Sequence, residues 1–267
     1  MLPSRDEIVQ AYRKYCELVA DADDTIDLSH ERFFYPTTLL PLGIYVQRNA
    51  KKVVKPTNPD VSNYVSLITG HRREGFLYSD SYMPIVCVPK APYAFDPIFS
   101  AIIGICDQGR KFGGVKAFEY YLAELSQNIY DHSEFQNAYI MVQRYEKKGF
   151  VEIVLIDDGI SIPGSYERHG VTAADDNEHL KNAMNGASTK LEGSRGCGLG
   201  TSIKLLTKMD GQFFLVSRRG ALYADAREQT FFKLAAQEIY NGTLITIRVP
   251  YPARELSNEA FYHAIEG

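Results

Sequence analysis

Apolar and polar positions alternate with a period of two along much of the second half of the chain, which is the pattern of β-strands. Lys147, Lys148 and Gly149 separate two of these runs, so the sequence predicts an antiparallel hairpin there. A second hairpin is predicted further along, and the tail is expected to continue as strands. The expected strands cover residues 138–146, 150–157, 211–217, 221–224, 231–234 and 243–249, with a turn at Asn241 and Gly242.

Apolar positions that recur every three or four residues predict the helices of this half. Asp96 followed by Pro97 provides an N-cap and a first helical position, so a helix is expected to begin there. A longer helix is expected over residues 115–133. Residues 164–195 are polar and rich in small side chains, with one short helix expected over 176–184, and we interpret this long segment as a lid.

The first 95 residues contain a helix after Ser4 and then short runs in the order strand, helix, strand, helix, which favours a small α/β layer. The first helix of that order is expected to begin after Pro41. A proline-rich connection follows, so a domain boundary is expected near residue 95. The chain is thus predicted to contain a small α/β domain, residues 1–95, and a larger domain, residues 96–267.

The composition is that of a globular protein, with 45% hydrophobic and 23% charged residues in a chain of 267. The net charge of −4 gives no electrostatic reason to expect nucleic acid as a partner. The 4 cysteines form no closely spaced pair and no cluster with histidine, so neither zinc nor a disulfide framework is indicated. No secretion signal and no membrane-spanning apolar run is found, so a cytoplasmic location away from the membrane is expected.

Two groups of polar residues could carry chemistry. Glu124, Asn128 and His132 fall four residues apart on an expected helix, so they would share one face. Such a face would be costly to bury without a function, whereas a solvated outer face is the simpler alternative. Asp157, followed by Gly159, ends an apolar strand, where a carboxylate is well placed to meet a ligand. A plain Asp-Gly turn is the alternative interpretation there.

Gly196, Gly198 and Gly200 alternate immediately before an amphipathic helix. The unpaired N–H groups and the dipole at a helix start favour a bound anion, and glycine lets a phosphate come close. A flexible linker is the weaker alternative, because the glycines adjoin the helix without a spacer. The Rossmann fingerprint fails because Thr201 occupies its final position after a loop, and no Walker P-loop is present.

Taken in order, these motifs resemble the Bergerat ATP site of the GHKL superfamily, which includes gyrase B, Hsp-type chaperones, histidine kinases and MutL. The resemblance covers residues 96–250. It implies an α+β fold whose C-terminal part is a two-layer α/β sandwich, with a mixed sheet and helices on one face. Residues 24–70 resemble the STAS-like domain that precedes an ATPase domain in some bacterial signalling proteins, although Thr37 stands where that pattern has glycine.

The resemblance also implies roles for individual residues. Asn128 matches the Mg²⁺ ligand, and Glu124 matches the acid that activates water in the members that hydrolyse ATP. Asp157 matches the acid that hydrogen-bonds the adenine amino group. Ser161 is a departure, because the motif usually has a second glycine there. The other nucleotide-binding positions implied are Gly159, Lys190 in the lid, and Gly196, Gly198, Leu199, Gly200 and Thr201 in the phosphate loop.

Together these residues suggest a regulatory protein that binds ATP with Mg²⁺ and slowly hydrolyses it, with lid closure coupled to the N-terminal domain or to a protein partner. The spacing of Glu124, Asn128 and His132 also resembles that of anti-sigma-factor serine kinases, which implies as one alternative a serine/threonine protein kinase that acts on a STAS-like partner. Another is an assembly module that binds nucleotide without hydrolysing it. The protein partner is expected to belong to a signalling or defence pathway, and the oligomeric state is left open, with a homodimer among the options.

Overall fold

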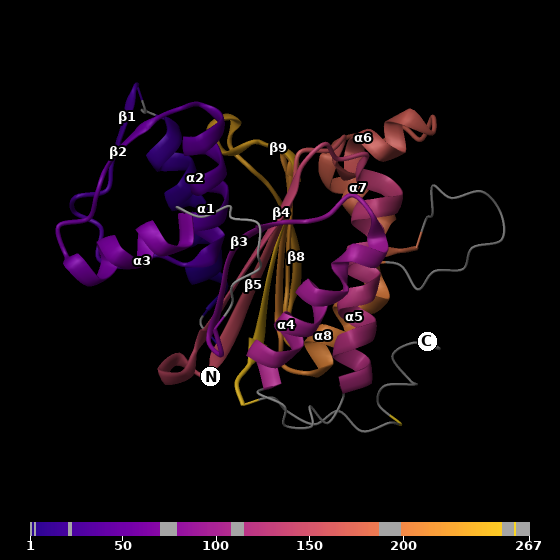
Figure 1. The fold of residues 1–267 in the computed structure, drawn as a ribbon. Coiled ribbons are helices and arrows are strands. Elements are labelled where there is room, and N and C mark those ends of the chain that lie inside the picture. The colour runs from indigo at the N-terminus through magenta and orange to yellow at the C-terminus, as the bar shows by residue number, and fades with distance from the viewer. Residues whose placement is uncertain are drawn as a thin grey trace.

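The computed structural model describes residues 2, 4–20, 23–69, 79–107, 115–186, 199–252 and 259, and it shows an α+β protein built around one large sheet (Figure 1). The α+β class expected from the sequence is confirmed. The helices are α1 (Arg5–Ala20), α2 (Pro36–Arg48), α3 (Pro59–Thr69), α4 (Asp96–Asp107), α5 (Val115–Asn128), α6 (Ser161–Arg168), α7 (Asp176–Met184) and α8 (Leu199–Lys208). The strands are β1 (Thr25–Asp27), β2 (Lys52–Val54), β3 (Tyr82–Cys87), β4 (Ala138–Tyr145), β5 (Phe150–Asp157), β6 (Gln212–Arg218), β7 (Gly220–Ala224), β8 (Gln229–Lys233) and β9 (Tyr240–Pro250). The shorter helical turns are η1 (Pro92–Phe95), η2 (Ile129–Ser133), η3 (Glu146–Lys148) and η4 (Ala236–Glu238).

The large sheet has seven strands in the order β3-β4-β5-β9-β6-β7-β8. Every neighbouring pair is antiparallel, so the expected mixed sheet is wrong. Tight turns join β4 to β5 and β6 to β7, and strands joined in this way must run antiparallel. The strand β9 then enters between β5 and β6, antiparallel to both, and therefore lies at the centre of the sheet.

Both faces of the sheet are buried at its centre, where all 8 residues of β5 are buried. One face packs against α4, α5, α7 and α8, in a core that includes Leu125 and Ile153. The other face packs against α1 and α2, which we call the N-terminal layer, in a core that includes Tyr12 and Phe214. Figure 1 shows the sheet between these two groups of helices. The described helices of the C-terminal part thus pack on one face, as expected, and the N-terminal layer covers the other, because a strand that is apolar on both sides needs cover on both sides.

A fully buried ion pair helps to attach the N-terminal layer to the sheet. Nε of Arg248 on β9 donates to Glu152 on β5 at 2.7 Å, and both side chains are 0% exposed. The other Glu152 oxygen accepts from the backbone N–H and the hydroxyl of Thr37, at 2.9 and 2.7 Å. The helix α2 begins at Pro36 and not after Pro41, because Pro36 takes the first helical position and Glu152 satisfies the N–H of Thr37.

The large sheet continues across the expected domain boundary. The strand β3, which precedes residue 95, pairs with β4, which follows it. The boundary itself stays a prediction. The strands β1 and β2 form a separate two-stranded parallel sheet and are connected through α2. Within the ranges described above, no helix is both long and apolar enough to cross a membrane.

Candidate functional site

The carboxyl group of Asp157 lies at the last position of β5 and is only 5% exposed. The backbone N–H of Gly159 donates to its Oδ1 at 2.8 Å, and Thr243 on β9 lies directly opposite and also hydrogen-bonds it. Burial raises the pKa of Asp157 to about 7, although the hydrogen bond from Gly159 opposes the rise. The charge of the adjacent Asp158 raises the pKa further. A buried acceptor with a perturbed pKa at a strand end is a candidate ligand-binding group.

Two glycines allow backbone segments beside Asp157 to approach more closely than a side chain would permit. A Cβ on Gly159 would lie 2.0 Å from the carbonyl oxygen of Ser133 at the end of η2. A Cβ on Gly242 would lie 2.1 Å from the carbonyl oxygen of Asp157, and Gly242 has a φ of 126°. The expected turn at Asn241 and Gly242 is wrong, because both residues lie inside β9. Glycine is therefore required at both sides of the strand end.

Ser161 adopts a left-handed backbone conformation, with a φ of 71°, that glycine adopts more readily. Its hydroxyl accepts from the backbone N–H of Gly164 at 3.1 Å, within the first turn of α6. The sequence interpretation missed the helix α6, which begins at Ser161. The helix α7 has the predicted bounds. The expected lid is helical over much of its first part, up to residue 184, and residues 187–195 lie outside the described residues.

Glu124 and Asn128 lie four residues apart on α5, and both are partly buried. The next turn, η2, is π-helical, so the spacing rule of an α-helix does not place His132 on their face. Ser133 ends this turn and accepts from the backbone N–H of Ile160 at 2.8 Å, which joins the end of α5 to the turn after β5. Among the described residues, Nδ2 of Asn128 is buried without a hydrogen-bond partner. Such a buried amide needs a partner, and a ligand could supply it.

Of the predicted phosphate loop, the structure describes Leu199, Gly200 and Thr201, which form the first turn of α8. The Leu199 side chain packs in the core, so only its backbone could meet a ligand. A Cβ on Gly200 would lie 2.0 Å from the carbonyl oxygen of Met184, at the end of α7. Glycine at this position therefore brings the start of α8 against the end of α7. Lys190, Gly196 and Gly198 lie outside the described residues.

The direction of the chain places Asp157, the end of α5 and the start of α8 at the same end of the large sheet. The strand β6 begins opposite Arg248 and ends beside Thr243, so it starts far from Asp157 and runs toward it. The helix α8 leads into the start of β6 through a tight turn, so its own first turn, with Gly200, lies toward the Asp157 end. The helix α8 also packs against α5, whose last residue is Asn128. The predicted residues that the structure describes are thus gathered around this end.

The sequence interpretation missed two buried hydroxyl groups, that of Thr243 opposite Asp157 and that of Ser217 on the next strand beyond Thr243. The Ser217 hydroxyl donates to the carbonyl oxygen of Gly242 at 3.1 Å and accepts from the backbone N–H of Ile162 at 2.9 Å. These contacts connect the turn after β5 to β6 and β9. The position of Thr243 opposite Asp157 follows from the register between β5 and β9. The sequence does not indicate this register until the two strands are known to pair.

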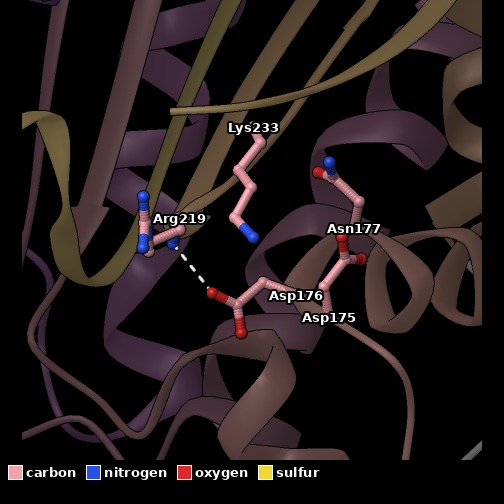
Figure 2. A pocket seen from close by; sticks show the side chains of 5 residues that line it. All are labelled: Asp175, Asp176, Asn177, Arg219 and Lys233. Atoms are coloured by element: carbon pink, nitrogen blue, oxygen red, sulfur yellow. Dashed lines mark hydrogen bonds between the residues drawn. The ribbon is translucent and has the colours of Figure 1, made fainter. Parts of the chain in front are cut away.

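A separate small cavity of about 130 Å³ lies beside the start of α7, and Figure 2 shows the side chains around it. Asp175 caps α7 by accepting from the backbone N–H of Glu178, and Asp176 accepts from the backbone N–H of Arg219 at 3.0 Å. Asp176 thus fixes the start of α7 to the turn between β6 and β7. The cavity contains none of the predicted site residues; it is lined by Asp175, Asp176, Asn177, Arg219 and Lys233.

In the part of the chain that the structure describes, no group of three or more His, Cys, Asp or Glu side chains could hold a metal ion by itself. Searches with protein-family models and among curated proteins found no match to this chain. The case for a function therefore depends on the geometry around Asp157.

Proposed function

We propose that this chain binds ATP with Mg²⁺ in a fold of the Bergerat type, with the adenine amino group donating to Asp157. The observation that carries the proposal is the burial of this carboxyl at a strand end, beside Gly159. A buried carboxylate is costly unless it is hydrogen-bonded, and a ligand that donates to it would offset part of that cost. Its pKa of about 7 means that it can be ionised at physiological pH and accept such a hydrogen bond.

The residues on α5 and α8 fit the phosphate end of the same ligand. Magnesium prefers oxygen ligands and retains several waters, so one amide oxygen together with phosphate oxygens can hold it. Oδ1 of Asn128 would supply that oxygen, and no acidic cluster is needed; Nδ2 of Asn128, which lacks a partner among the described residues, would donate to a phosphate oxygen. The backbone N–H groups in the first turn of α8 would donate to phosphate oxygens. Glu124, one turn before Asn128, would orient and deprotonate a water or a hydroxyl group.

Calorimetry with ATP and Mg²⁺ at pH 8 tests the adenine assignment. Asp157→Asn replaces the carboxylate with an amide of the same shape, so the affinity should fall about tenfold to a hundredfold, as expected when a hydrogen bond to a charged group is weakened. The matched control is Asp60→Asn in the first turn of α3, where the side chain is exposed. The control should bind as wild type does. Equal affinities of Asp157→Asn and wild type would contradict the assignment.

The fate of the γ-phosphate then separates slow hydrolysis from the alternatives. With labelled ATP, we expect free phosphate, and Glu124→Ala should retain binding while release falls about 10²–10⁴-fold. Glu119→Ala is the control, because Glu119 lies on α5 but off the face that Glu124 and Asn128 share. Label on a serine or threonine of a STAS-like protein would identify a kinase. Neither release nor transfer in a single turnover would identify a module that only binds nucleotide.

A further inference from the structure

The carboxylate of Asp158, next to Asp157, connects three segments of the chain. Its Oδ1 accepts from the backbone N–H groups of Gln136 and Asn137, at 2.9 and 2.7 Å. Its Oδ2 accepts from the side-chain amide of Asn137 at 2.9 Å and from the guanidinium group of Arg48 at 2.6 Å. Partial burial alone would raise the pKa of Asp158, but the hydrogen bonds from Asn137 and Arg48 hold it below its ordinary value. Asp158 is therefore charged at neutral pH and needs these donors.

Arg48 is the last residue of α2. It therefore reaches Asp158 from the N-terminal layer, which lies on the opposite face of the sheet from α5 and α8. It also hydrogen-bonds Tyr139, which lies in the core beneath that layer. The start of α2 is fixed as well, since Thr37 donates twice to Glu152. The start of α2 is thus attached to β5 through Glu152, and its end is attached to Asp158, the residue that follows β5.

The lengths of the two elements agree with this arrangement. A helix of 13 residues such as α2 is about 20 Å long, and the six residue steps from Glu152 to Asp158 in extended chain also span about 20 Å. The helix α2 packs against β5 along the way. A shift of the end of α2 would therefore act directly on Asp158, which immediately precedes the Gly159 turn and follows Asp157.

We propose that Arg48 positions the ligand-binding turn after β5 through Asp158, so that the N-terminal layer regulates the affinity of the site around Asp157. The nature of the ligand, ATP, rests on the proposed function, whereas the positioning does not. Loss of the Arg48 guanidinium group should lower the affinity for the ligand through two effects. First, the turn after β5 is held by fewer contacts. Second, the charge of Asp158 is no longer balanced by Arg48, and this charge disfavours the ionised form of the neighbouring Asp157 carboxyl, which accepts the hydrogen bond from the ligand.

Arg48→Gln tests the proposal, with Arg13→Gln as a matched control. Arg13 on α1 also forms an ion pair that joins the N-terminal layer to a later segment, at 2.9 Å from Glu238. The two arginines are 42% and 41% exposed, and their partners 19% and 12%, so the two variants remove similar ion pairs. Arg48→Lys is the conservative variant, because it retains the charge but not the geometry of the guanidinium group.

Two readouts separate positioning from general stability. Arg48→Gln should weaken ATP binding about twofold to fivefold, the range expected for a partly exposed ion pair, and Arg48→Lys should recover part of the loss. Without ATP, Arg48→Gln should speed hydrogen exchange at Gln136, Asn137 and the residues after β5 by a similar factor. Arg13→Gln should leave both readouts at wild-type values, with the thermal midpoints of the two glutamine variants alike.

The outcomes distinguish this proposal from the proposed function. If Arg48→Gln and Arg13→Gln behave alike in both affinity and exchange, the positioning role of Arg48 is refuted. If wild type does not bind ATP, the proposed function fails, and exchange in the ligand-free protein still decides the positioning role. If Arg48→Gln does not fold, exchange in Arg48→Met, which also lacks the charge, decides it, and wild-type exchange at Gln136 and Asn137 in that variant would overturn the proposal.

Discussion

Replacing Asp157 by asparagine tests the electrostatics of the site without any ligand, because it removes one charge and keeps the shape of the side chain. Burial raises the pKa of Asp157 from 3.8 to about 7, so the folded protein binds the proton more tightly than the unfolded chain. The carboxyl therefore contributes stability that is fully present below a pH of about 4. That contribution is lost as the pH rises through about 7.

The magnitude follows from the size of the shift. About three pKa units correspond to about 4 kcal/mol between the low and high pH limits. Of this, about 2–3 kcal/mol is lost between pH 5 and pH 8, because the unfolded carboxyl is already ionised at pH 5. The asparagine variant forms no charge and lacks this loss. Its amide nitrogen fits poorly against the N–H of Thr243, which costs about 1–3 kcal/mol, but that cost is the same at both pH values.

Urea unfolding at pH 5 and pH 8 measures the effect in wild type, Asp157→Asn and the exposed control Asp60→Asn. From pH 5 to pH 8, the unfolding free energy of wild type should fall by about 2–3 kcal/mol relative to Asp157→Asn. The control should follow wild type. If the difference between wild type and Asp157→Asn is the same at both pH values, the carboxyl is not held in a site that favours its neutral form, and our account of the site is wrong.

Three further predictions follow from the same region. ATP affinity should fall about tenfold from pH 8 to pH 6, because protonated Asp157 loses its role as an acceptor, and calorimetry that finds no pH dependence would contradict this. Gly200→Ala should lower the unfolding free energy by about 3 kcal/mol, since its Cβ would lie 2.0 Å from the Met184 carbonyl oxygen; a wild-type urea midpoint would exclude that close approach. Ser161→Gly should be more stable than Ser161→Ala by about 1 kcal/mol, because alanine retains the cost of the left-handed φ of 71°, and equal unfolding free energies would remove the strain argument.

Local sequence patterns predicted most elements of the fold. The helix α4 begins at Asp96 as predicted, although Asp96 has helical φ and ψ directly after η1 and so does not cap the helix. The helix α7 has the expected bounds, and the hairpins β4–β5 and β6–β7 form where alternation indicated. These signals succeed because turn chemistry and side-chain periodicity depend on residues close in sequence. The same locality explains why Asp157 could be singled out as the end of an apolar strand.

Contacts between distant residues were beyond the reach of these patterns. Nothing local distinguishes Pro36 from Pro41 as the start of α2, because the deciding partner of Thr37 is Glu152, which lies 115 residues away. The placement of β9 between β5 and β6 likewise depends on pairing over long separations, and it alone brings Thr243 opposite Asp157. Nothing local in the sequence indicated that α1 and α2 would cover one face of the large sheet.

The burial of both faces of the sheet also limits how this protein can be divided, whether by an experimenter or in evolution. A chain that began near residue 95 would lose β3 and expose the edge of β4. It would also expose the apolar face that includes Met141, Val154 and Phe214, which favours self-association. Expression of residues 96–267 alone should therefore give aggregates. For the same reason, the two halves cannot be exchanged independently with those of other proteins, because each substitution under α1 or α2 must be matched on the strands that it covers.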